Sequence, residues 1–165
     1  MPPTALAFSG PLPPSAAHHD HPALRFYTAY LKDFGQNHGT ADPEAYYAAD
    51  CTMTMPDGST IHGGIWTYVG RELYGGFSRV SREMLSFILV SDDEARTHEI
   101  HIQLVTSLHT GDRRVDLPQA FTYTLGRADE GKGTEGLQFR SLSCYYDWSI
   151  LKAARAGIDV APHAE

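Results

Sequence analysis

The sequence has few cysteines, few basic residues and no long apolar run. Two cysteines, Cys51 and Cys144, in 165 residues are too few for a disulfide framework, so a reducing, cytoplasmic setting is the default expectation. The formal net charge of −7 argues against a nucleic-acid partner, because phosphate binding requires Lys and Arg. No apolar stretch approaches the roughly 20 residues of a membrane-spanning helix, so we expect no membrane partner either.

Sequence motifs for a cofactor or a metal are also missing. The sequence contains neither a CxxC nor an HExxH pattern, and we therefore expect no cofactor and no metal. One run of potential ligands exists, His18-His19-Asp20-His21. It could hold a metal or be a solvated tail, and we favour the tail because a disordered segment supplies no fixed ligand geometry.

Length and composition describe one ordinary globular domain. Of 165 residues, 42% are hydrophobic and 20% are charged, the size and balance of a single domain. The first residues are rich in proline and lack the basic start and apolar run of a secretory signal. We expect a flexible Pro-rich arm over residues 1–20, a folded domain over 21–156 and a tail over 157–165. An arm that packs on a partner subunit is the alternative.

Helix signals come first along the chain. After Asp20-His21-Pro22, apolar residues at helical spacing predict a helix over residues 23–34. The Asp-Pro-Glu run at residues 42–44 predicts a second, short helix that ends near Ala49. The run Gly70-Arg71-Glu72 predicts a third helix, which ends near Arg79.

Strand signals dominate the second half of the chain. A meander of long antiparallel strands after a set of helices is typical of an α+β domain, in which helices pack on one face of a curved sheet. A sheet that curls around the first helix leaves a cavity lined by both. Extended or alternating patterns, separated by turn residues, predict strands over residues 50–55, 84–90, 96–108, 115–125 and 137–148, before a last short helix over 150–156.

Four short segments match a known pattern: Ala41–Asp50, Gly70–Glu72, Leu108–Asp112 and Tyr145–Trp148. In this order and spacing they resemble the nuclear transport factor 2-like, SnoaL-like superfamily. The resemblance implies a cone-shaped, curved antiparallel sheet wrapped around N-terminal helices, with a pocket inside the cone, and a homodimer formed through the outer face of the sheet. The superfamily includes ketosteroid isomerase, scytalone dehydratase, limonene epoxide hydrolase, polyketide and meroterpenoid cyclases, and non-catalytic binding proteins, so the fold does not give the function.

The catalytic acids of these relatives have no clear counterpart in this sequence. The base Asp of ketosteroid isomerase-like enzymes falls on Met55, which cannot accept a proton, and their second Asp falls near Gln119. The Arg-x-Asp of the epoxide hydrolases aligns with residues 101–103, and their second Asp aligns with Cys144. His109 matches one of the two histidines of scytalone dehydratase-like enzymes.

The strongest catalytic candidates form a stripe on one predicted strand. Glu99, His101 and Gln103 share one face, because side chains alternate along a strand. If this face lines the pocket, His101 can act as a general acid–base near neutral pH, Glu99 can orient it and Gln103 can bond a substrate oxygen. Alternatively, the apolar residues between them face the core, which leaves the stripe on a solvent or dimer face.

Other candidates come from the strand ends and the aromatic residues. Asp147 could be a catalytic base or could cap the following segment. Gln119 interrupts an apolar stripe and needs a partner, since an unpaired buried amide is costly. Trp66 could form a lid over the pocket mouth, although most aromatic rings are expected in the core. The complete set of candidate substrate-binding residues is Tyr30, Thr52, Thr54, Trp66, Gln103, Gln119, Phe121 and Tyr146.

The sequence thus leads to two hypotheses about function. The first is a cofactor-independent acid–base enzyme, a cyclase, isomerase or dehydratase, that acts on an apolar oxygenated small molecule such as a polyketide or terpenoid intermediate. The alternative is a non-catalytic small-molecule binding or interaction protein of the same fold. A pocket that holds a perturbed histidine or carboxylate would support the enzyme, and an apolar or collapsed cavity would support the binding protein.

Overall fold

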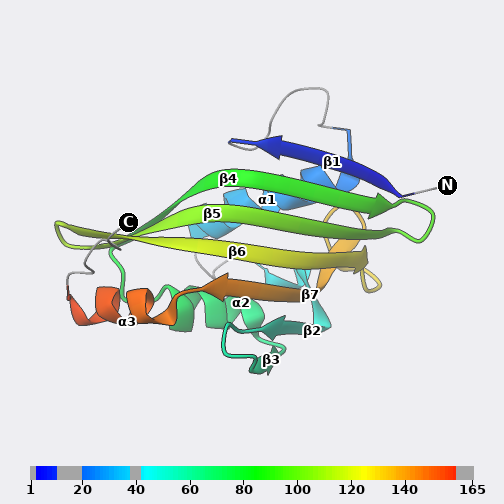
Figure 1. Cartoon of the computed structure of the whole chain (residues 1–165). Helices are drawn as coiled ribbons and strands as arrows, with labels where there is room; N and C mark the ends of the chain where they lie inside the picture. The colour runs from blue at the N-terminus through cyan, green and yellow to red at the C-terminus, as the bar shows by residue number, and fades with distance from the viewer. Residues whose placement is uncertain (1–2, 11–19, 38–41, 159–165) are drawn as a thin grey trace.

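A computed structural model describes residues 3–10, 20–37 and 42–158 of the chain. Within these residues the chain forms a curved seven-stranded sheet with the strand order β1-β4-β5-β6-β7-β2-β3, and helices lie behind and below it (Figure 1). This confirms the predicted α+β class. The strands are β1 (Thr4–Ser9), β2 (Tyr47–Thr54), β3 (Thr60–His62), β4 (Arg79–Asp92), β5 (Thr97–Thr110), β6 (Arg113–Arg127) and β7 (Leu137–Tyr146).

The long first helix, α1 (Pro22–Asn37), packs on the inner face of the sheet. Its buried side presents Phe26, Tyr27 and Tyr30 to the strands. The Phe26 ring meets Phe139 of β7 edge to face, with ring centroids 4.9 Å apart. The remaining helices are the 3-10 turn η2 (Pro43–Ala45), α2 (Ile65–Thr67), which continues as the π-helical turn η3 (Tyr68–Leu73), and α3 (Trp148–Ala156).

Two predicted helices differ from the structure. Asp42 does cap a helical start, since its side chain accepts from the Glu44 amide, but the turn ends at Ala45 and β2 follows at once. The helix does not continue to Ala49 because Tyr47 already belongs to strand β2 and pairs with Phe139 of β7. The third helix begins at Ile65 and ends at Leu73, earlier than predicted.

The Pro-rich arm is not entirely flexible. Residues 4–9 form strand β1, which pairs antiparallel with β4. The expectation of a flexible arm therefore does not hold for these residues. Leu6 and Phe8 turn toward the core, and the Phe8 ring stacks on Phe87 with centroids 4.9 Å apart. β1 thereby covers an edge of β4 that would otherwise present unpaired backbone groups. Residues 1–2 and 11–19 of the arm lie outside the described residues.

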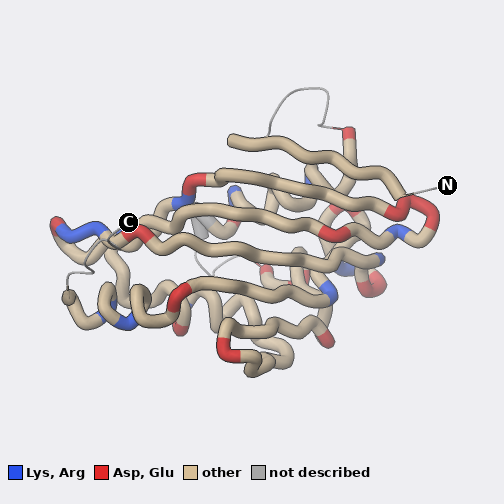
Figure 2. Tube along the Cα trace, viewed as in Figure 1, with Lys and Arg blue, Asp and Glu red and all other residues tan. Residues whose placement is uncertain are grey.

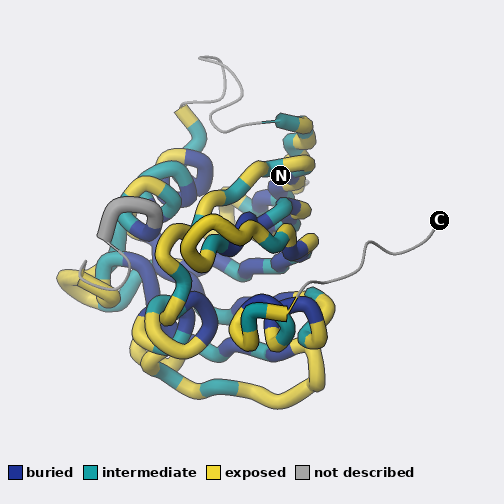
Figure 3. Tube along the Cα trace, turned by 90° about the vertical axis from the view of Figure 1, so that its left-hand side faces the viewer, coloured by how far each residue is buried: buried dark blue, intermediate teal, exposed yellow. Residues whose placement is uncertain are grey.

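The core lies between α1 and the concave face of the sheet (Figure 3). Charged residues are concentrated at turns and strand ends, whereas the middle of the long strands is mostly free of them (Figure 2). Among the described helices, none combines the length and the apolar character needed to cross a membrane. The concave side of the sheet and α1 thus enclose the apolar interior of the domain.

Candidate functional site

A small cavity of about 30 Å³ lies inside the cone, between α1 and the sheet. Tyr30 and Phe34 of α1 line one side, and Leu104 and Phe121 of the sheet line the other. Tyr74, which follows η3, contributes another aromatic wall. This volume is about that of one water molecule in the liquid. Aromatic side chains thus occupy most of the pocket that the family resemblance implies.

One charged side chain lies against this aromatic wall. The guanidinium carbon of Arg82, on β4, is 4.4 Å from the ring centroid of Phe34 and 4.8 Å from that of Tyr74. These are cation–π distances, in which the faces of the rings attract the positive charge. Arg82 also lines the cavity, so it is the cationic group closest to any molecule held there among the described residues.

Gln119 is the buried polar residue beside this cavity. It is 4% exposed, and its Oε1 accepts from the Tyr74 hydroxyl at 2.9 Å and from the Thr106 hydroxyl at 2.5 Å. The carbonyl oxygen is the acceptor of an amide, so both hydroxyls donate to it. The amide nitrogen Nε2 then faces the other way and has no hydrogen-bond partner among the described residues.

Gln119 borders the cavity through its neighbours. Its strand partner on β5 is Leu104, and Phe121 lies two residues along the same face of β6. Both residues, together with its hydrogen-bond partner Tyr74, line the cavity. An unpartnered buried donor costs about 1–3 kcal/mol. A hydrogen-bond acceptor in the cavity region would remove this penalty.

Tyrosine hydroxyls supply the other polar groups of the interior. The hydroxyls of Tyr30 and Tyr47 are 2.8 Å apart. Burial raises the pKa of Tyr30 to about 12, and it also raises the pKa of Tyr27, Tyr47 and Tyr123. At neutral pH these groups therefore keep their protons and act as hydrogen-bond partners, not as bases.

The structure brings several of the predicted binding residues into this interior. Tyr30 and Phe121 line the cavity, and Gln119 borders it. Trp66 is buried and stacks on Tyr46 with centroids 5.9 Å apart, so of the two alternatives that the sequence left open, a lid or a core residue, the structure fits the core residue. Its Nε1 has no hydrogen-bond partner within the described structure.

The remaining binding candidates do not line the cone cavity. Thr52 and Thr54 are half-buried, and they alternate along β2 with the buried Met53, so they point away from the core. Tyr146 is half-buried, and its ring lies 5.7 Å from that of Trp148. The Tyr146 hydroxyl lacks a hydrogen-bond partner in the described part of the chain.

The catalytic stripe lies on the outer face of the sheet. Ile102, between His101 and Gln103, is buried, whereas the side chains of His101 and Glu99 are 44% and 60% exposed. His101 Nε2 is 3.6 Å from the Glu99 carboxylate, and its Nδ1 is 3.2 Å from Thr122 Oγ1. The pocket interpretation of this stripe is therefore wrong, and the alternative, a solvent or dimer face, fits the structure.

Asp147 caps a helix, which is the structural role that the sequence analysis gave as the alternative to a catalytic base. Its Oδ1 accepts from the Ser149 amide at 2.8 Å and from the Ser149 hydroxyl at 2.6 Å. These are the bonds of an N-cap at the start of α3. The carboxylate satisfies the helix end and does not line the cone cavity.

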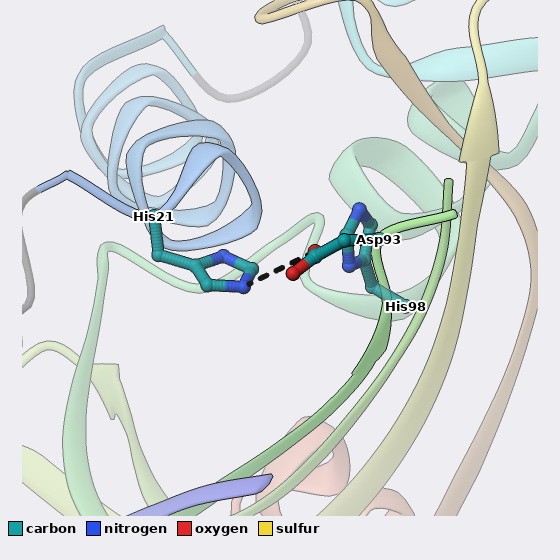
Figure 4. A group of neighbouring side chains, drawn as sticks. All are labelled: His21, Asp93 and His98. Atoms are coloured by element: carbon teal, nitrogen blue, oxygen red, sulfur yellow. Dashed lines mark ion pairs between the residues drawn. The ribbon is translucent and has the colours of Figure 1, made fainter. Parts of the chain in front are cut away.

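A second cavity, of about 620 Å³, lies at the start of α1. His21, Asp93 and His98 line it and point toward one another (Figure 4). His21 directly precedes α1, Asp93 lies in the turn between β4 and β5, and His98 is on β5. The sequence run at residues 18–21 contains His21 but gives no sign of its partners. His18 and His19 lie outside the described residues.

A hydrogen-bond chain connects the two histidines of this cluster. The Ala23 amide donates to His21 Nδ1 at 3.2 Å, so in the neutral ring Nε2 carries the proton. That nitrogen lies 3.1 Å from Ser91 Oγ, and Ser91 Oγ lies 2.9 Å from His98 Nδ1. Burial lowers the pKa of His21 and of His98, which keeps both rings neutral near pH 7.

Comparisons with known proteins identify the fold. No family model and no curated protein matches the sequence. An NTF2-like protein from Cytophaga hutchinsonii is 12% identical, with a TM-score of 0.56 over 76% of this chain and 95% of that one. The S. rosetta CaMKII hub is 12% identical, with a TM-score of 0.61 over 83% and 99% of the two chains. A ketosteroid isomerase-like fold protein from Catenulispora acidiphila, in complex with trimethylamine, is 17% identical, with a TM-score of 0.54 over 83% and 97%. These likenesses show that the chain has the NTF2-like fold.

Proposed function

We propose that this chain of NTF2-like fold binds a small apolar molecule that carries an acceptor oxygen, inside its cone. The supporting observation is the Nε2 group of Gln119, a buried donor without a partner among the described residues, beside a cavity walled by aromatic rings. Rings suit an apolar body, and a free amide hydrogen suits a carbonyl or ether oxygen. An oxygenated polyketide or terpenoid has this chemistry.

Binding of such a molecule requires the cavity to enlarge, since about 30 Å³ holds little more than one water. Arg82 is the side chain best suited to move. It reaches the cavity from β4 and contacts the faces of Phe34 and Tyr74. A long, flexible arginine can keep its charge in water while its stem moves along an apolar surface. We therefore propose that Arg82 swings away from these rings when a ligand enters.

A binding role fits this interior better than acid–base turnover. None of the described residues that line the cavity is a carboxylate or an imidazole. The tyrosines hold their protons, because burial raises their pKa. The interior therefore offers hydrogen-bond donors but lacks an evident base, which favours the non-catalytic hypothesis.

An acid–base cyclase, isomerase or dehydratase is the second candidate, and the Tyr30–Tyr47 pair supports it. When one hydroxyl of the pair donates to the other, the acceptor hydroxyl keeps its own hydrogen for a substrate oxygen. Such a donor polarises a carbonyl in an isomerase or dehydratase reaction. Under this hypothesis Tyr30→Phe slows turnover of a polyketide or terpenoid substrate, followed by product mass spectrometry, while ligand binding persists.

Matched ligands test the binding proposal. Calorimetric titration compares two ketones, acetophenone and menthone, with the hydrocarbons ethylbenzene and p-menthane. We expect the wild type to bind each ketone about ten-fold more tightly than its hydrocarbon, the ratio that corresponds to about 1.4 kcal/mol. Gln119→Leu should remove this preference. Gln103→Leu is the matched control, because Gln103 lies on the outer face of the sheet, and it should keep the preference.

Two results would contradict the binding proposal. The first is that none of the four probes binds to the wild type. The second is that Gln119→Leu keeps the full preference for ketones. Far-UV circular dichroism of each variant verifies that the fold is intact before the titrations are compared.

We also propose that the protein is a homodimer that pairs through the outer face of the sheet. Ile88 and Tyr145 are exposed large apolar side chains, and they point outward because their strand neighbours Phe87 and Cys144 are buried. Size-exclusion chromatography with light scattering should give twice the 18.2 kDa mass of the chain. A monomer at all protein concentrations would contradict the proposal of a homodimer.

Both cysteines suit a reducing compartment. Cys51 and Cys144 are free and buried, and burial raises the pKa of each thiol to about 12. The thiols therefore remain protonated and unreactive. On this basis we propose the cytoplasm as the place where the protein works.

A further inference from the structure

Three potential metal ligands from separate parts of the chain meet at the second cavity. One ligand atom each of His21, Asp93 and His98 lie within 4.8 Å of one another. His21 Nε2 is 3.9 Å from Asp93 Oδ1, and the two imidazole rings meet edge to face with centroids 5.5 Å apart. In Figure 4 the His21 ring extends from the helix start toward the Asp93 carboxylate, with His98 beside it.

Burial makes this cluster different from a chance group of surface histidines. His98 is 3% exposed, and its ring is held by Ser91, which is also buried. His21 is partly buried and is held at Nδ1 by the Ala23 amide. Only Asp93 is exposed, and its turn borders the cavity. His98 is therefore held in place by the fold before any ion arrives, and the partly buried His21 lies next to it.

We propose that His21, Asp93 and His98 form a binding site for a divalent transition-metal ion. Two imidazoles and one carboxylate are the ligand set of zinc and of other first-row transition metals, whereas magnesium and calcium prefer oxygen ligands. Three protein ligands leave at least one position open, as in catalytic metal sites. The adjoining cavity of about 620 Å³ gives that position access to a water or a small anion.

Metal binding at His21 Nε2 would replace its hydrogen bond with Ser91 Oγ and would also change the bond that the Ala23 amide makes to Nδ1, which gives a specific readout. With Nδ1 of His21 accepting from Ala23, the proton sits on Nε2, the nitrogen nearest to Asp93. For Nε2 to bind a metal, this proton must leave it and move to Nδ1. An Nδ1–H group cannot accept from the Ala23 amide, so that contact must open. The Ala23 amide resonance therefore reports binding independently of any activity.

The test uses the full chain, freed of metal by dialysis, and zinc as the probe. We expect one zinc per chain by calorimetry and a shifted Ala23 amide resonance in a ¹H–¹⁵N NMR spectrum. Cobalt substitution should give the visible absorption of a site with nitrogen and oxygen ligands. Asp93→Asn and His98→Gln should each weaken zinc binding about ten-fold or more. Because Asp93 is exposed, Asp93→Asn keeps the test valid if His98→Gln fails to fold.

Two controls separate this site from other histidines. The double variant His18→Ala/His19→Ala removes the neighbouring sequence run, and His62→Gln removes an exposed imidazole on β3. Both should bind zinc as the wild type does. The proposal is overturned if the wild type takes up no zinc, or if His18→Ala/His19→Ala abolishes binding while Asp93→Asn keeps it.

Discussion

Tyr74 donates its hydroxyl hydrogen to Oε1 of Gln119 across 2.9 Å, and this bond ties the segment after η3 to strand β6. Thr106 donates to the same oxygen. The amide is thereby held with its oxygen at two hydroxyls, while its nitrogen is buried without a hydrogen-bond partner among the described residues. The proposed preference of the cone for oxygenated ligands rests on this amide.

We first predict that this bond contributes measurably to stability. Tyr74→Phe removes one donor but leaves Thr106 on the Gln119 oxygen, so it should lower the free energy of unfolding by about 1 kcal/mol. Gln119→Leu leaves two buried hydroxyls without their acceptor, which costs about 1–3 kcal/mol, but it also removes the unpartnered Nε2 donor, so the net loss of stability should be smaller than this cost. Urea denaturation of both variants and of the double variant measures the coupling. Additive effects would show that the two side chains do not interact.

The second prediction concerns the N-terminal strand. Phe8→Ala removes the ring that stacks on Phe87 and, because Phe8 is only partly buried, should lower the free energy of unfolding by roughly 2 kcal/mol, less than for a fully buried Phe. Ala7→Ser is the control, since Ala7 is exposed on the same strand, and it should stay within about 0.5 kcal/mol. Equal stability of Phe8→Ala and wild type in thermal or urea unfolding would show that Phe8 does not pack on Phe87 of β4.

The third prediction follows from the position of His101 on the outer face. His101→Ala should leave the ketone affinity of the cone unchanged, because the imidazole contacts Glu99 and Thr122 outside the cavity. Calorimetry with the ketone probes makes the comparison, and Gln119→Leu is the positive control for lost preference. A several-fold loss of ketone affinity in His101→Ala would contradict this prediction, because it would mean that His101 contributes to ligand binding.

The fourth prediction concerns alkaline pH. Burial raises the pKa of Tyr30 from 10.0 to about 12, so the folded state holds this proton more tightly than the unfolded state. The stabilisation is complete below pH 10 and is lost as the pH rises toward 12. Tyr27, Tyr47 and Tyr123 shift in the same direction. Only Tyr145 among the tyrosines is exposed, so most of the tyrosinate absorbance should rise together with loss of the circular dichroism signal. Ionisation of most tyrosines well before unfolding would contradict the buried cluster.

The fifth prediction concerns the cap of α3. Asp147→Ala removes the acceptor of the Ser149 amide and should lower the free energy of unfolding by about 1 kcal/mol. Asp147→Asn keeps a capping oxygen and should lose much less. Urea denaturation distinguishes the two variants. Similar losses in both would indicate that the negative charge, and not the hydrogen bond, is what stabilises the helix start.

Local patterns in the sequence determined the class of fold. The four long strands and the turns between them were predicted in the right order, because alternation and turn residues act over a few neighbouring positions. The helix that begins at Pro22 was predicted for the same reason. Tyr30, Gln119 and Phe121 were also identified as candidates from their residue types, and the structure brings them to one interior.

Only the tertiary structure decided which face of each strand is buried. Along β5, polar and apolar residues alternate, and either set could have faced the pocket. The assembled core buries Ile102 and leaves His101 outside. The pairing of β1 with β4 and the meeting of His21 with His98 also depend on contacts between distant parts of the chain. A period of two defines two faces equally well, and the burial of apolar surface in the assembled fold selects between them.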